Sequence, residues 1–160
     1  VHARERMQEA RDVIDLLVAR GEVVYGVTTG FGDLATTSIP PDDAARLQEN
    51  LLASHAAGVG RPFPREVVRA MLLLRANTLA LGHSGCRPLL VDRICQFLAR
   101  GIHPVVPEQG SVGASGDLAP LAHLALPRRI PHAPLQPARR PDRAAYRQLH
   151  AAAGAARDVV

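Results

Sequence analysis

The sequence contains no lysine, so all 19 of its basic residues are arginine. Basic surfaces that bind nucleic acid usually mix the two residue types. The charge is also uneven, because residues 1–126 carry 12 arginines against 13 acidic residues while residues 127–160 carry 7 arginines against 2 aspartates. The formal net charge of +4 therefore belongs to the C-terminal segment, and we expect no nucleic-acid partner.

Cysteines and long apolar runs are also scarce. Cys86 and Cys95 are too few to build a disulfide scaffold, which favours two reduced thiols in a cytoplasmic protein. Residues 83–86, His-Ser-Gly-Cys, have the spacing of metal ligands, but no second ligand pair accompanies them and we expect no metal site. No apolar run reaches membrane-spanning length, and residues 1–4 are not a signal peptide, so we expect no membrane partner. The chain starts within a helical pattern and without Met, which suggests a late start.

Apolar residues at helical spacing dominate what the sequence does contain. With 160 residues, 47% hydrophobic and 21% charged, the chain is long enough for one folded core. The spacing, the glycines and the prolines predict helices over residues 3–20, 40–57, 64–82 and 88–101. Helix 64–82 is apolar on most sides and should lie in the core. A β-type run at 23–27 and an extended segment at 102–109 complete a mainly α fold with one short β-type segment.

The stretch from Gly110 to Asp117 has the composition for an unusual reaction. Its glycines let backbone approach backbone closely. In a sharp bend, the amide nitrogen of Gly116 can attack the carbonyl carbon of Ala114, and loss of water, including the Ser115 hydroxyl, leaves a methylidene on a five-membered ring. The following helix would direct unpaired N–H groups and its positive dipole end toward this electrophile. Such a helix end favours negative charge that develops on the ring.

Other interpretations of this stretch stay open on the residues alone. A plain glycine-rich turn explains the composition for ordinary conformational reasons. A serine nucleophile elbow would need its second glycine one place later and an Asp or Glu and then a His further on. A phosphate-binding loop would need a good strand before it, whereas residues 102–107 hold two prolines.

Three sequence blocks resemble the histidine and aromatic amino-acid ammonia-lyases. Residues 110–126 read GSVGASGDLAPLAHLAL, which is similar to the signature in which Ala-Ser-Gly cyclises to a methylidene-imidazolone group. Two further blocks occur in the same order as in that family, namely residues 24–32, VYGVTTGFG, and residues 54–60, SHAAGVG. The resemblance covers residues 1–126 and implies the N-terminal region of the all-helical aromatic amino-acid lyase fold.

The resemblance also implies a reaction and its residues. Ala114, Ser115 and Gly116 would form the methylidene-imidazolone with no external cofactor, Tyr25 would be the catalytic base, and His55 would bind the substrate ring. An imidazole partner suits a polar ring better than a bare phenyl. The expected reaction is therefore L-histidine to trans-urocanate and ammonia, the first step of histidine degradation, in a cytoplasmic homotetramer. A tyrosine or phenylalanine ammonia-lyase, an aminomutase of the same family and an inactive truncated fragment are the alternatives.

The composition changes after Leu126. Five prolines and five arginines occur between residues 127 and 143, without helical periodicity. Pro127 should interrupt the helix that begins after the glycine-rich stretch, because it lacks an N–H and clashes with the preceding turn. We expect residues 127–160 to form a disordered tail outside the family pattern, with one weak helix over 143–157. A frame-shifted or truncated reading is our hypothesis for its origin.

Overall fold

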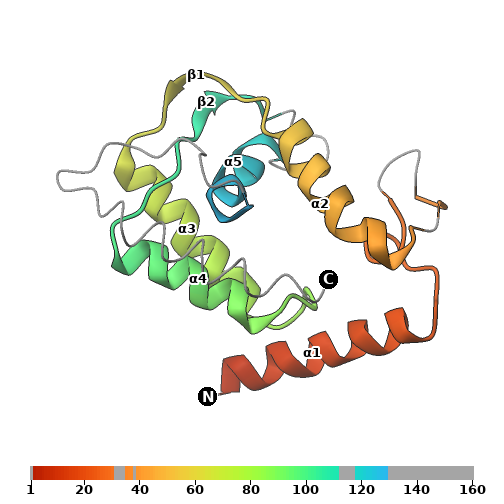
Figure 1. Ribbon diagram of the computed structural model, residues 1–160. Coiled ribbons are helices and arrows are strands. Elements are labelled where there is room, and N and C mark those ends of the chain that lie inside the picture. Colours follow the sequence, from red (N-terminus) through yellow and green to blue (C-terminus); the bar gives the residue numbers. More distant parts are fainter. Residues whose placement is uncertain (1, 31–34, 38, 112–117, 130–160) are drawn as a thin grey trace. The chain divides into compact units, whose positions relative to one another are not determined.

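The structure is a computed structural model that describes residues 2–30, 35–37, 39–111 and 118–129. Within these residues it is mainly helical, as predicted, with one small antiparallel sheet of two strands (Figure 1). The elements are α1 (His2–Ala19), α2 (Pro41–His55), β1 (Val59–Pro62), α3 (Arg65–Ala80), α4 (Pro88–Ala99), β2 (Pro107–Gln109) and α5 (Leu118–Arg129). Among the described residues, no helix is both long enough and apolar enough to cross a membrane.

The predicted glycine caps at the ends of α1 and α4 are confirmed. At the end of α1, Gly21 has a φ of 66° and its N–H bonds to the carbonyl of Val18, while Glu22 N–H bonds to that of Leu17. The same pair of bonds closes α4 at Gly101, where the N–H groups of residues 101 and 102 reach carbonyls three and five residues back. In this arrangement a left-handed glycine satisfies carbonyls that the helix leaves unpaired.

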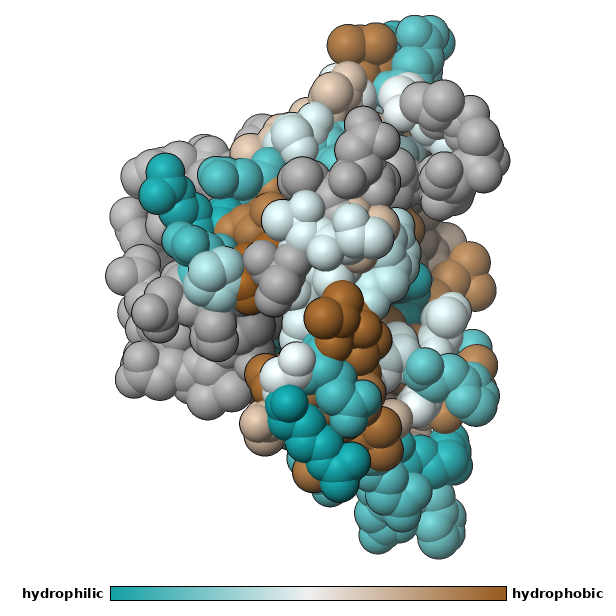
Figure 2. Space-filling view, turned by 90° about the vertical axis from the view of Figure 1, so that its right-hand side faces the viewer, coloured by the Kyte–Doolittle hydropathy of each residue, from teal (hydrophilic) through white to brown (hydrophobic). Residues whose placement is uncertain are grey.

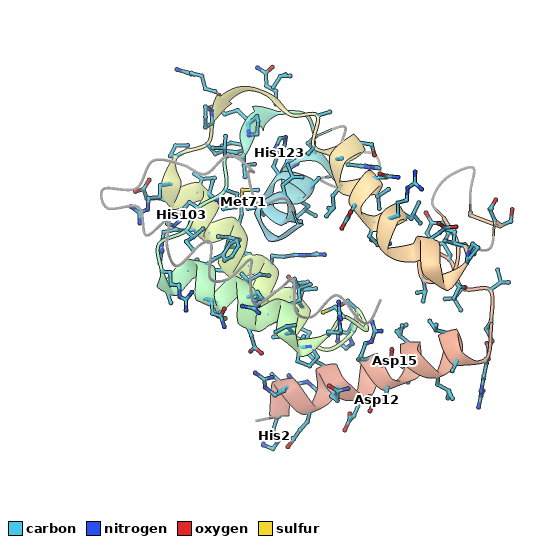
Figure 3. All side chains as sticks on the ribbon, viewed as in Figure 1. His2, Asp12, Asp15, Met71, His103 and His123 are labelled. Atoms are coloured by element: carbon cyan, nitrogen blue, oxygen red, sulfur yellow. The ribbon has the colours of Figure 1, made fainter. Side chains whose placement is uncertain are left out.

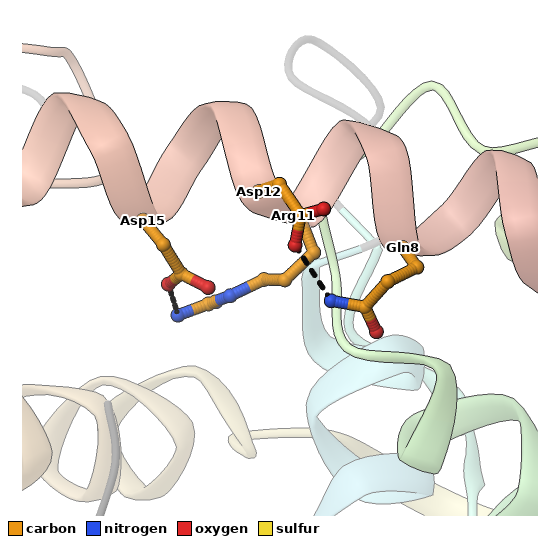
Figure 4. Close-up of polar contacts among 4 residues, drawn as sticks. All are labelled: Gln8, Arg11, Asp12 and Asp15. Carbon is orange, nitrogen blue, oxygen red and sulfur yellow. Dashed lines mark hydrogen bonds and ion pairs between the residues drawn. The ribbon is translucent and has the colours of Figure 1, made fainter.

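The chain forms two compact units. Unit 1 holds Val1–Leu47 and Leu74–Cys95, and unit 2 holds Gln48–Leu73 and Gln96–Val160. In unit 1, the guanidinium of Arg4 in α1 lies 2.6 Å from the carboxylate of Asp92 in α4, and Met7 is buried. The exposed side of α1 carries contacts one turn apart, Gln8 with Asp12 and Arg11 with Asp15 (Figure 4). Each such pair stabilises a helix by only about 0.2–0.5 kcal/mol, so burial of Met7 contributes more to holding α1.

Unit 2 contains most of the buried apolar residues. Its core is contributed by the first half of α3, the end of α4, the segment before β2, and α5, with Val68 and Val106 fully buried. The remaining core residues are Leu72, Phe97, Ile102, Ala119, Ala122 and Leu124. Strand β1 pairs with β2 in the register Val59 opposite Gln109 and Pro62 opposite Pro107. The strand pair therefore joins the segment after α2 to the segment that leads toward residue 110.

Three sequence predictions need correction. Residues 23–27 form no strand, because a hydrogen-bonded turn occupies residues 25–28, and the strands occur instead at 59–62 and 107–109. Helix α5 does not stop at Pro127 but continues to Arg129. A proline this close to a helix end removes only one hydrogen bond.

The third correction concerns α3, which is not buried on most sides. Val68, Leu72, Ala76 and Leu79 line a buried face at helical spacing, whereas Leu73 and Leu74 are 60% and 65% exposed. Apolar side chains are likewise visible among hydrophilic ones in the space-filling view (Figure 2). The apolar content of α3 therefore exceeds what the described part of the chain covers.

The predicted tail helix over 143–157 lies outside the described residues.

Candidate functional site

His55, the predicted substrate-binding residue, is the last residue of α2 and is partly buried. Its Nδ1 lies 2.8 Å from the carbonyl oxygen of Leu51 and 3.1 Å from the hydroxyl of Ser54, and that hydroxyl also donates to Leu51 at 2.9 Å. A carbonyl oxygen can only accept, so Nδ1 of His55 carries the proton. In the neutral ring Nε2 is then a bare acceptor. The end of α2 therefore fixes both the ring and its tautomer.

Tyr25, the predicted catalytic base, lies in unit 1 at the first residue of the turn over residues 25–28, and its side chain is 62% exposed. The hydroxyl of Thr28 accepts the Val24 N–H at 2.8 Å and donates to the Glu22 carbonyl at 2.6 Å. Thr29, which is buried, accepts the Gly26 N–H at 3.2 Å. These two threonines hold the backbone on both sides of Tyr25, a positioning role that we did not predict from the sequence.

The segment that follows His55 meets the start of α5 in unit 2. The Gly58 N–H donates to Nε2 of His123, on the second turn of α5, at 3.1 Å (Figure 3). One residue beyond the Val59–Gln109 pair, Gly58 lies opposite Gly110, the first glycine of the predicted reactive stretch. The structure thus brings the SHAAGVG block and both flanks of residues 112–117 together. Ala114, Ser115 and Gly116 themselves lie outside the described residues.

Two histidines of unit 2, His103 and His123, which are labelled in Figure 3, have lowered pKa values. Burial lowers the pKa of His103 below its ordinary value of 6.5, and the positive charges of Arg65 and Arg69 lower it further, against the opposing Gly101 carbonyl and Glu66. Burial alone lowers the pKa of His123. The neutral forms suit their contacts, since Nε2 of His123 accepts a hydrogen bond and Nε2 of His103 lies 3.4 Å from a guanidinium nitrogen of Arg69.

Sequence reasoning missed His123 although it stands inside the quoted signature. The one available signal was a single imidazole on an otherwise apolar helix, LAPLAHLAL. Its partner is a backbone N–H 65 residues earlier, and no sequence pattern marks such an acceptor. Within the described residues there is no group of three or more His, Cys, Asp or Glu side chains able to hold a metal ion.

Comparison with known proteins identifies the family of this chain. The sequence profile of the aromatic amino acid lyases matches residues 1–149. The chain belongs to that family. Among curated relatives, a histidine ammonia-lyase of Bacillus anthracis is 57% identical over 122 residues, which cover 76% of this chain and 24% of the relative. The histidine ammonia-lyase of Bacillus thuringiensis is 56% identical over 125 residues, covering 78% and 25%.

Solved structures of aromatic amino acid lyases also match. Histidine ammonia-lyase from Trypanosoma cruzi superposes with a TM-score of 0.72 at 46% identity, covering 79% of this chain and 24% of that one. Tyrosine aminomutase from Streptomyces globisporus has a TM-score of 0.79 at 35% identity, covering 96% and 28%. The chain spans about a quarter of the length of the curated relatives it matches. The family profile extends past Leu126 to residue 149, so the domain boundary at Leu126 stays a prediction.

Proposed function

We propose that this chain is part of an ammonia-lyase that converts L-histidine to trans-urocanate and ammonia. The observation that carries the proposal is the 57% identity to a histidine ammonia-lyase across a segment that includes three quarters of this chain. Of the residues that the family resemblance assigns to the reaction, this chain contains Tyr25, His55 and the Ala114-Ser115-Gly116 triad. In this proposal the triad matures to the methylidene-imidazolone without an external cofactor.

The residue types around the triad fit such a group. Glycine supplies the attacking nitrogen, serine the hydroxyl that is lost, and Gly110 leaves room for backbone to approach backbone at the start of the stretch. The group would supply an electrophile that makes the substrate amino group a better leaving group. The start of α5 would direct its free N–H groups and positive dipole end toward the negative charge that develops there.

The fixed tautomer of His55 gives the proposal its substrate preference. Because Nδ1–H is bonded to the Leu51 carbonyl, Nε2 can accept a hydrogen bond from a ring N–H of histidine or from the hydroxyl of tyrosine. The ring of phenylalanine offers no such donor. Tyr25, held through Thr28 and Thr29, would act as general base and remove a hydrogen from the carbon that carries the ring.

The electrophile is tested in a full-length relative by replacing the serine that matches Ser115 with alanine. Without the hydroxyl the methylidene cannot form, so the intact mass should no longer show the loss of two water molecules and activity should disappear with it. A fully active Ser115→Ala enzyme would contradict the proposed function.

The recognition role of His55 is tested with His55→Leu, assayed on histidine, tyrosine and phenylalanine. Loss of one hydrogen bond should lower kcat/KM for histidine by roughly tenfold to a hundredfold and leave phenylalanine little affected. His83→Leu, at an exposed histidine, is the matched control. An unchanged preference for histidine would remove His55 from substrate recognition.

A tyrosine aminomutase or a related aromatic lyase is the second candidate, because the structural match to tyrosine aminomutase covers 96% of the chain. The same three-substrate assay separates the two, since the aminomutase would return a β-amino acid. We further propose a cytoplasmic location, which the two free thiols Cys86 and Cys95 favour, and a homotetramer, which the family resemblance implies. An inactive fragment remains the third candidate, which the exposed leucines of α3 favour.

A further inference from the structure

Two glycines and one histidine form a close junction at the start of the reactive stretch. A Cβ atom on Gly58 would lie 2.9 Å from Nε2 of His123 and 3.2 Å from the carbonyl oxygen of Gln109. A Cβ atom on Gly110 would lie 2.8 Å from the Cα of Gly58 and 3.2 Å from the Cβ of Ala119. The separations of 2.8 and 2.9 Å are shorter than real Cβ contacts, so a side chain at either position would force a neighbour to move, and at Gly110 that neighbour is backbone. The backbone of residue 58 thus packs directly on that of residue 110.

The junction fixes both flanks of residues 112–117 at once. Gly110, before them, touches Ala119, which follows them on the first turn of α5. His123, one turn further along α5, is bonded to Gly58, which itself packs on Gly110. Strand pairing between Val59 and Gln109 holds the same two segments from the other side. The stretch that carries Ala114-Ser115-Gly116 therefore starts and ends on parts of the chain that are in contact.

The hydrogen bond that Nε2 of His123 accepts leaves the other ring nitrogen without a partner among the described residues. Since Nε2 accepts from Gly58, the neutral ring carries its proton on Nδ1, and this buried atom has no hydrogen-bond partner in the described part of the chain. A buried donor without an acceptor is unfavourable. Leucine at this position would avoid that cost while filling a similar apolar space. The histidine is thus better explained by what it positions than by stability alone.

We propose that His123 is a positioning residue that holds the Gly58–Gly110 junction in the geometry required for cyclisation of Ala114-Ser115-Gly116. In cyclisation the Gly116 nitrogen bonds to the Ala114 carbonyl carbon, one water leaves as the ring C=N bond forms, and a second leaves as Ser115 loses its hydroxyl and Cα hydrogen. Ring closure within a chain depends steeply on the placement of the two reacting atoms. This inference rests on the proposed function.

The test uses a full-length relative that has glycine and histidine at the matching positions. His123→Leu removes the acceptor, and His123→Gln restores an acceptor oxygen at about the same reach. His103→Leu is the matched control, because His103 is a buried histidine of the same unit that contacts Arg69 and not the junction. The measurement is the fraction of chains whose intact mass is short by two water molecules, together with the thermal midpoint, kcat and KM.

We expect His123→Leu to slow the mass loss by about ten- to a hundredfold, while His123→Gln recovers most of it and His103→Leu leaves it intact. Hydrogen exchange of the Gly58 amide should quicken in His123→Leu and slow again in His123→Gln. Complete cyclisation in His123→Leu, or an equal defect in His103→Leu at the same thermal midpoint, would overturn the inference. Neither result would contradict the proposed function. That function is contradicted separately if the intact mass of the unsubstituted enzyme is never short by two water molecules.

A second pair of variants tests the junction without substituting the histidine. Gly58→Ala places its methyl group against Nε2 of His123, and its φ lies outside the left-handed region. Gly60→Ala is strained by a φ of 91°, yet its methyl group would meet nothing nearer than 3.6 Å. We expect the mass loss to fail in Gly58→Ala and to persist in Gly60→Ala. The opposite order would show that backbone strain, and not the junction, controls cyclisation.

Discussion

At the scale of single residues, His103 and His123 make unit 2 sensitive to acid. His103 is 2% exposed, and burial together with the charges of Arg65 and Arg69 lowers its pKa, whereas burial alone lowers the pKa of His123. Both pKa values are lower in the folded chain than in an unfolded one. The unfolded chain therefore binds more protons than the folded chain at pH values below 6.5.

The free energy of unfolding should consequently fall as pH is lowered below about 6.5 and level off above it. Urea unfolding from about pH 5 to about pH 7.5 measures this slope. His103→Gln cannot take up the proton and should flatten the slope, while His83→Gln, at an exposed site, should not. A slope that is the same in His103→Gln and in the unsubstituted chain would contradict the assignment to His103.

At the scale of elements, two threonine hydroxyl groups hold the turn around Tyr25. Thr28 connects the Val24 N–H to the Glu22 carbonyl, and its own carbonyl accepts the Ile39 N–H at 3.0 Å. Thr29 is buried and bonded on both sides, to the Gly26 N–H and the Gly30 carbonyl. A turn closed in this way presents Tyr25 at the surface of unit 1 without a strand beneath it.

Thr28→Val keeps the shape of the side chain but loses both hydroxyl bonds, which should cost about 1 kcal/mol for each bond. In a full-length relative, kcat should fall more than KM changes, because the candidate base is displaced while substrate recognition through His55 remains. Thr78→Val is the matched control, since that hydroxyl donates only to the Leu74 carbonyl within α3. Equal effects on kcat from the two variants would argue against a special role for the turn.

At the scale of the whole chain, the apolar surface of α3 is the feature that sets its behaviour in solution. On α3, Leu73 and Leu74 are 60% and 65% exposed and Val67 is 40% exposed, and Leu81, just after its end, is 49% exposed. On α1, Val13 and Leu16 are 55% and 49% exposed. Helix faces of this kind favour association with further protein.

We therefore expect the 160-residue chain, purified alone, to associate and to make no urocanate. Replacing Leu73 and Leu74 together by glutamine should lower the associated fraction with little change in unfolding free energy, because neither side chain is buried. Arg75→Gln on the same helix is the control. Light scattering and solution mass give the readout, and a stable tetramer that produces urocanate would defeat the fragment reading.

The helices were determined by the sequence alone. Their periodicity, the glycines after α1, α3 and α4, and the prolines before α2, α3 and α4 act within a few residues, so local chemistry was enough to place the four helices to within about two residues. The three sequence blocks were also readable, because Tyr25, His55 and the Ala114-Ser115-Gly116 triad each stand in a recognisable neighbourhood.

Only the tertiary structure decided how these blocks are supported. Strand β1 is rich in glycine and proline and has no strand pattern of its own. It forms because it pairs with β2, which lies more than 40 residues later in the sequence. The exposed leucines of α3 and the continuation of α5 past Pro127 likewise depend on what packs nearby and not on local preference. The hydrogen bond from Gly58 to His123 joins residues that are 65 positions apart in the sequence. It can therefore form only when the chain folds and brings the backbones of Gly58 and Gly110 together.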